Sequence, residues 1–146
     1  MAKSEQFLKE AFAGESQANR KYLAFAAKAD QEGHPQAARM FRAAAEAETV
    51  HAHSHLRPLN GIRSTKENLQ EAIAGETHEF KKMYPEMIEK AKAEKNNDGV
   101  QTFHYANEVE KIHAALYTKT LQNLGKNEAV DYYVCPFCGN TVEKAP

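Results

Sequence analysis

Hydrophobic residues recur along this chain every three or four positions, with polar residues between them, which is the spacing of one helical face. The pattern predicts four helices, whose ends are marked by glycine, proline and capping residues. They run from about Ser4 to before Gly33, from Pro35 to about Leu56, from the capping box Ser64-Thr65-Lys66-Glu67 to about Glu94, and from Asn97–Gly99 to Gly125. Pro85 lies inside the third helix and predicts a kink, because proline donates no backbone hydrogen bond.

The last residues of the chain lack this periodicity. The residue types from Tyr132 to Gly139 predict a short strand and a turn instead. We therefore predict an all-α fold, a four-helix bundle over residues 1–126, followed by a short non-helical tail over residues 127–146.

The sequence contains an internal repeat. Residues 11–15 (AFAGE) recur 61 positions later as 72–76 (AIAGE), and residues 46–52 recur 62 positions later as 108–114. The chain is thus one helical hairpin written twice. Ala18 in the first copy corresponds to Glu79 in the second. A site built from both copies therefore carries one extra carboxylate.

Ionisable residues interrupt the apolar stripe of every predicted helix near its middle. They are Glu15, Glu48, His51, Glu76, Glu79, Glu110 and His113. Five buried carboxylates without compensating charge would cost several kcal/mol each. Two divalent cations would bring four positive charges against these five negative ones. The pattern therefore predicts a dinuclear metal site inside the bundle.

The residue types also indicate which metals fit. Each Glu-x-x-His pair places an oxygen and a nitrogen ligand on one helical face. This mixed donor set suits iron or manganese better than calcium, which avoids nitrogen, or structural zinc, which favours thiolates. His55 lies one turn beyond His51 on the same stripe and is a candidate hydrogen-bond partner near the site.

Composition and charge exclude several classes of partner. The 146 residues carry a net charge of −1, and no basic stretch predicts nucleic-acid binding. No apolar run approaches the roughly 18 residues of a membrane span. Two cysteines three positions apart are not a disulfide framework, so we expect a cytoplasmic protein.

The helical part resembles the rubrerythrin family of ferritin-like di-iron proteins. The resemblance covers about residues 4–124 and rests on residues 13–18 (AGESQA), Glu48-x-x-His51, Gly75-Glu76-x-x-Glu79 and Glu110-x-x-His113. It implies a ferritin-like four-helix bundle with two non-haem iron ions. It also implies a peroxidase that reduces hydrogen peroxide to water. Manganese or zinc could occupy the site in a given preparation.

The same resemblance implies roles for individual residues. Glu79 and His51 would be alternative ligands to one iron, exchanged as the iron changes redox state. Tyr22 and Tyr84 match family positions that hydrogen-bond near the metals, so we treat both as candidate catalytic residues.

The tail matches only part of the family pattern. Typical members end in a rubredoxin domain, where two Cys-x-x-Cys motifs give one iron four thiolates. Here Cys135 and Cys138 supply the first motif, and Pro146 follows without a second. A rubredoxin-type iron at these cysteines therefore requires completion by a longer chain or a second copy. Without it, we expect electrons from an external donor protein, rubredoxin-like or a reductase.

The connection between the two repeats predicts a dimer. If both copies met at one site within a chain, the segment from Leu56 to Thr65 would have to run about 28 Å along the bundle and about 10 Å sideways. Fully extended, its nine steps reach roughly 30–32 Å. Pro58 and the Asn60-Gly61 turn make such extension implausible. We therefore hypothesise a domain-swapped homodimer.

Three alternative functions are also compatible with the sequence. The same ligands could serve a ferroxidase, an iron-handling protein or an oxygen-reducing ferritin-like protein. A non-catalytic helical bundle would not take up two metals per site. A thiol oxidoreductase based on Cys135 and Cys138 lacks the alternating strands and helices that usually frame such a motif.

Overall fold

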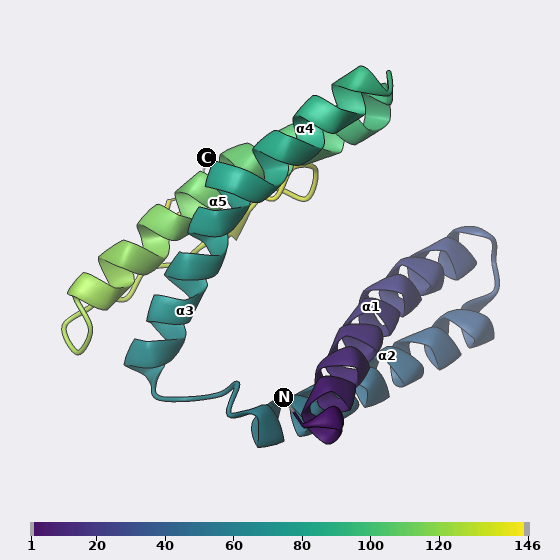
Figure 1. Cartoon of the computed structure of the whole chain (residues 1–146). Coiled ribbons are helices and arrows are strands. Elements are labelled where there is room, and N and C mark those ends of the chain that lie inside the picture. The colour runs from purple at the N-terminus through teal and green to yellow at the C-terminus, as the bar shows by residue number, and fades with distance from the viewer. Residues whose placement is uncertain (1, 145–146) are drawn as a thin grey trace. The chain divides into compact units, whose positions relative to one another are not determined.

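The computed structural model describes residues 2–144, and the elements are almost all helical, as the sequence predicts. In chain order they are α1 (Lys3–Gln31), α2 (Pro35–Leu56), the 3₁₀ turn η1 (Arg57–Leu59), α3 (Thr65–His78), the π-helical turn η2 (Glu79–Met83), α4 (Tyr84–Ala93), α5 (Asn97–Gln122), β1 (Tyr133–Val134) and β2 (Thr141–Val142) (Figure 1). The chain divides into two compact units, residues 1–63 and 64–146. The predicted all-α fold with a short non-helical tail is confirmed.

The first unit is a hairpin of α1 and α2. Gly33 adopts a φ of +77° after α1, a conformation that glycine accepts without strain, and Pro35 opens α2 at its first position. Ala26, Ala38 and Ala45 are almost fully buried, so small side chains line the interface between the helices. The two backbones can therefore approach closely.

The second unit pairs α5 with a helix interrupted in its middle. Ser64 and Glu67 form the predicted capping box at the start of α3. The consecutive elements α3, η2 and α4 then pack along α5. After α5, β1 and β2 form a two-stranded antiparallel ladder in which Val134 lies opposite Thr141. This tail packs on α5, where the Phe137 ring meets the Tyr105 ring edge-to-face at 5.5 Å.

The kink predicted at Pro85 takes the form of a π-helical turn. Because proline has no N–H group, the regular ladder cannot continue through it, and the backbone N–H of Tyr84 bonds to the carbonyl of Glu79, five residues back. Such a turn inserts one residue. The repeat offset therefore changes from 61 to 62, which makes Tyr84 the counterpart of Tyr22.

Ring packing confirms this change of register. Tyr22 lies 6.2 Å from Phe41, and Tyr84 lies 6.2 Å from Phe103, with nearly the same angle between the rings. Phe41 and Phe103 are themselves 62 residues apart. The extra residue in η2 thus restores equivalent aromatic pairs in the two hairpins.

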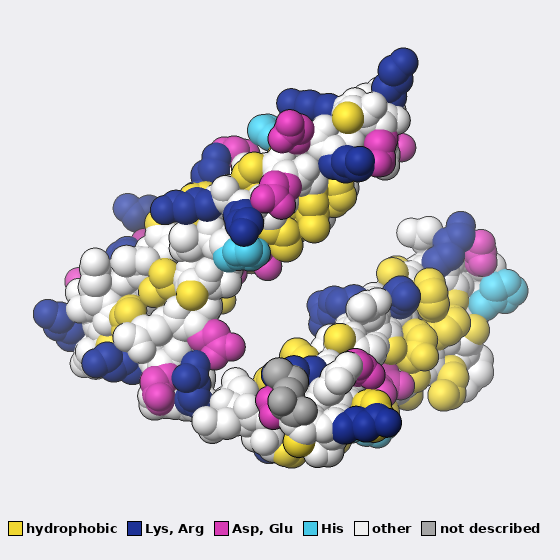
Figure 2. Space-filling model, viewed as in Figure 1, with side chains coloured by type: hydrophobic (Ala, Val, Ile, Leu, Met, Phe, Trp, Pro, Cys, Tyr) yellow, Lys and Arg dark blue, Asp and Glu magenta, His cyan; other side chains and the backbone are white. Residues whose placement is uncertain are grey.

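Each hairpin taken by itself leaves large apolar side chains uncovered. Figure 2 shows hydrophobic side chains gathered on one face of the α1–α2 hairpin. Phe25 and Met40 are exposed in the first unit, as are Met87 and Tyr117 in the second. A two-helix layer buries only one flank of each helix, so the stripe that the sequence predicts to be interior remains partly open. No helix within residues 2–144 is long and apolar enough to cross a bilayer.

Candidate metal centre

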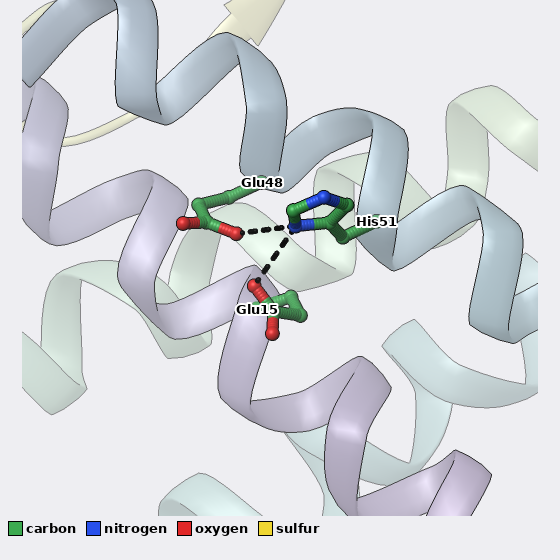
Figure 3. Close-up of side chains that lie close together, drawn as sticks. All are labelled: Glu15, Glu48 and His51. Carbon is green, nitrogen blue, oxygen red and sulfur yellow. Dashed lines mark hydrogen bonds and ion pairs between the residues drawn. The ribbon is translucent and has the colours of Figure 1, made fainter.

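Three predicted ligands converge in the first hairpin. Glu15 comes from α1, and Glu48 and His51 come from successive turns of α2 (Figure 3). The Nδ1 atom of His51 lies 2.9 Å from Glu48 Oε2 and 3.7 Å from Glu15 Oε2. All three ligand atoms lie within 4.8 Å of one another, close enough to bind one metal ion. We call this cluster the N-terminal half-site.

The second hairpin contains the same arrangement. Glu76 comes from α3, and Glu110 and His113 come from α5. His113 Nδ1 lies 2.9 Å from Glu110 Oε2 and 3.7 Å from Glu76 Oε2, which repeats both distances of the first cluster. We call this cluster the C-terminal half-site. The sequence repeat is therefore also a repeat of ligand geometry.

The electrostatics of the clusters fit a divalent cation. Burial, a hydrogen bond with Glu110 and the negative charges of Glu110 and Glu79 together raise the pKa of Glu76 to about 8. Its Oε2 atom is buried without a hydrogen-bond partner among the described residues. In the first hairpin, a hydrogen bond with Glu48 raises the pKa of Glu15. Converging acceptors of this kind are stabilised by a proton or by a metal ion, so the residues fit metal binding.

Glu79, the extra carboxylate of the second repeat, is the first residue of η2. It lies outside the three-residue cluster. Burial raises the pKa of its carboxyl, and the charge of Glu110 raises it further, while His113 lowers it. Glu79 is therefore close enough to the C-terminal half-site for the charges of Glu110 and His113 to shift its pKa.

The two tyrosines occupy equivalent positions in the hairpins. Burial raises the pKa of Tyr84, and the charges of Glu110, Glu79 and Glu76 raise it further, which places its hydroxyl near the acidic cluster. Tyr22 packs against Phe25 and Phe41. His55 lies near enough to the N-terminal half-site for its charge to lower the pKa of Glu15 slightly.

The two cysteines lie in a tight turn of the tail and form no disulfide. The N–H of Gly139 donates to the carbonyl of Cys135 at 2.9 Å. Backbone N–H groups of Cys138 and Phe137 lower the pKa of the Cys135 thiol, which favours the thiolate that binds metals. Within residues 2–144 no third ligand atom joins the two thiols in a metal-sized cluster. Metal binding at Cys135 and Cys138 stays a prediction.

The two half-sites differ in how far their histidine side chains are exposed. The side chain of His51 is 56% exposed, whereas that of His113 is 28% exposed. The difference comes with the tail, where Thr141 Oγ1 lies 2.9 Å from His113 Nε2. Sequence reasoning missed Thr141, because one polar contact across 28 residues leaves no periodic signal.

Comparison with known proteins supplies the family. Residues 6–121 match the family model of rubrerythrin. The chain is 36% identical over 157 residues to rubrerythrin-2 of Clostridium acetobutylicum, which covers 96% of this chain and 85% of the relative. The chain belongs to the rubrerythrin family. The resemblance inferred from the carboxylate and histidine motifs is therefore confirmed.

Nigerythrin provides a second rubrerythrin-like comparison. The nigerythrin of Nitratidesulfovibrio vulgaris is 34% identical over 146 residues, covering 90% of this chain and 72% of the relative. A solved structure of nigerythrin in the fully reduced, all-ferrous state matches with a TM-score of 0.56 at 31% identity, covering 99% of this chain and 79% of that one. The ferritin-like fold is thus confirmed, and the two carboxylate–histidine clusters make this a di-iron rubrerythrin-type protein.

Proposed function

We propose that this protein is a cytoplasmic non-haem di-iron peroxidase that reduces hydrogen peroxide to water. The observation that carries the proposal is the equal geometry of the two half-sites, each with two carboxylates and one imidazole. A buried carboxylate oxygen without a partner supports metal binding at one of them. The all-ferrous state of the related nigerythrin supports iron as the metal.

The proposed metal ligands are seven side chains drawn from both hairpins. They are Glu15, Glu48, His51, Glu76, Glu79, Glu110 and His113. When bound, two ferrous ions would supply the two electrons that, with two protons, convert one hydrogen peroxide into two water molecules. Glu79 has no carboxylate counterpart in the first hairpin, so the two metal positions would differ in charge.

The two tyrosines are the proposed hydrogen-bond or proton donors in this reaction. The Tyr84 hydroxyl is protonated at neutral pH, as tyrosine hydroxyls ordinarily are, so it can donate a hydrogen bond or a proton to hydrogen peroxide. Tyr22 occupies the corresponding position in the first hairpin. Packing against Phe41 and Phe103 restricts both rings, which holds each hydroxyl in place.

The active assembly is proposed to be a domain-swapped homodimer, in which each dinuclear site takes one hairpin from each chain. The connecting segment supports this assembly. Arg57–Leu59 form a 3₁₀ turn, which advances only about 2 Å per residue. With that turn, the nine steps from Leu56 to Thr65 reach about 26 Å, less than the roughly 28 Å along the bundle that a site within one chain would require.

The protein that restores the ferrous state is proposed to be a separate rubredoxin-like donor or a reductase. A tetrahedral rubredoxin-type iron needs four thiolates, and residues 2–144 contain two. Electrons would therefore reach the site from outside these residues.

Rapid mixing of the diferrous protein with each oxidant tests the function. We expect hydrogen peroxide to oxidise the iron at least about tenfold faster than dissolved oxygen at equal concentration. Stopped-flow absorbance during single turnover measures both rates. A faster reaction with oxygen would contradict the peroxidase and favour a ferroxidase or an oxygen-reducing protein.

A further inference from the structure

The tail brings a hydroxyl group to the outer side of the C-terminal half-site. Thr141 Oγ1 lies 2.9 Å from His113 Nε2, the ring nitrogen that points away from Glu110. The same Oγ1 lies 3.0 Å from the carbonyl oxygen of Gly139. Thr141 and His113 also line one pocket of about 420 Å³, together with Glu76 and Thr120.

The direction of these hydrogen bonds follows from the groups involved. A carbonyl oxygen can only accept, so the single proton of the Thr141 hydroxyl is donated to Gly139. The Thr141 oxygen must then accept from His113, which places the imidazole proton on Nε2. A neutral ring with this proton has its lone pair on Nδ1. Nδ1 is the atom that faces Glu110 and Glu76.

Contacts with α5 fix the position of Thr141. The Phe137 ring packs on Tyr105, and Lys119 Nζ lies 2.6 Å from the carboxylate of Glu143, two residues after Thr141. Since His113 lies on α5 as well, the hydroxyl and the ring are held on the same frame.

The first hairpin has no equivalent of this contact. Within residues 2–144, the hydrogen bonding of His51 is confined to Nδ1, and its side chain is twice as exposed as that of His113. No described residue therefore holds a proton on Nε2 of His51. The two half-sites share ligand types and distances, but among the described residues only the C-terminal half-site has a hydroxyl group hydrogen-bonded to Nε2 of its histidine.

We propose that Thr141 is a positioning residue for His113, whose hydroxyl selects the tautomer that binds metal and so strengthens one of the two metal positions. The inference rests on the metal site of the proposed function. Hydrogen-bond partners behind a ligating histidine commonly change metal affinity by about 10- to 100-fold. The effect on His113 should lie in that range.

Zinc titration of the metal-free full chain tests the role of the hydroxyl. We expect T141V, which keeps the shape and removes the hydroxyl, to weaken one of the two Zn²⁺ equivalents by about tenfold or more. T141S should restore the affinity. T120V is the matched control, because Thr120 lines the same pocket but donates its hydroxyl to Leu116 in its own helix.

Nuclear magnetic resonance of the zinc-loaded protein supplies a second readout. The Nε2 proton of His113 should be protected from exchange in the wild type, T141S and T120V, and should exchange rapidly in T141V. Unchanged zinc affinity and proton protection in T141V would overturn the proposal. A T141S variant as weak as T141V would also overturn it, because packing rather than the hydroxyl would then be responsible. Neither readout depends on peroxide turnover, so failure of the peroxidase assignment would be seen separately.

Discussion

Replacing Glu110 with alanine should lower peroxide turnover by about 100-fold or more, while the same change at Glu108 should leave turnover unchanged. Glu110 Oε2 lies 2.9 Å from His113 Nδ1, and its carboxylate interacts with Glu76, so the variant removes one of three converging ligands. Glu108 is exposed on the same helix and pairs with Lys111 at 2.7 Å. Steady-state peroxide consumption and bound iron per chain measure the effect.

The pair of variants separates loss of a ligand from damage to α5. Both replace a glutamate by alanine within one helical turn, so helix propensity changes equally. Thermal unfolding of the metal-free proteins should be similar for the two. Equal losses of turnover in both variants, or full turnover in E110A, would contradict a ligand role for Glu110.

Two inactive chains should regain activity when they are mixed. One chain carries E48A and H51A, which disable the N-terminal half-site, and the other carries E110A and H113A, which disable the C-terminal one. In a swapped dimer, a mixed pair contains one site built from two intact hairpins. Random pairing makes half of the dimers mixed, so co-refolded chains should recover about a quarter of the wild-type sites.

The control for this mixture is each double variant refolded alone, which should stay inactive. Mass spectrometry under native conditions confirms that mixed dimers are present. Mixed dimers without activity would show that each site is completed within one chain. A protein that stays monomeric at micromolar concentration and retains two irons would also rule out the swapped dimer.

Local rules in the sequence predicted the helices well. Gly33 and Pro35 separate α1 from α2, and the Ser64–Glu67 capping box begins α3, because these residues act on backbone groups within a few positions. The repeat also predicted that ligands of the same type would gather in each hairpin, since equal spacing on equal helices gives equal geometry.

Other features depend on interactions that cannot be inferred from the spacing of hydrophobic and polar residues. Pro85 indicates that the helical hydrogen-bond ladder is interrupted, but it does not show whether the helix takes in an extra residue. Only the change of the repeat offset from 61 to 62 residues signals the π-helical turn. The contact of Thr141 with His113 joins residues 28 apart through one hydrogen bond. The exposure of His51 reflects the open flank of a two-helix layer, whereas the apolar stripe in the sequence predicts an interior position.

Anaerobic titration of the metal-free protein with ferrous iron, followed by calorimetry in buffers of different ionisation enthalpy, shows whether metal ions replace protons in the acidic clusters. Metal ions are expected to neutralise the acidic clusters in place of protons. Because the pKa of Glu76 is about 8, this carboxyl still carries its proton at pH 7 and must release it when metal binds. We predict two ferrous ions per chain, release of about one proton from each Glu76 at pH 7, and affinity that rises with pH until about pH 8. Binding of no iron, or binding of iron without proton release, would contradict neutralisation of the clusters by metal ions.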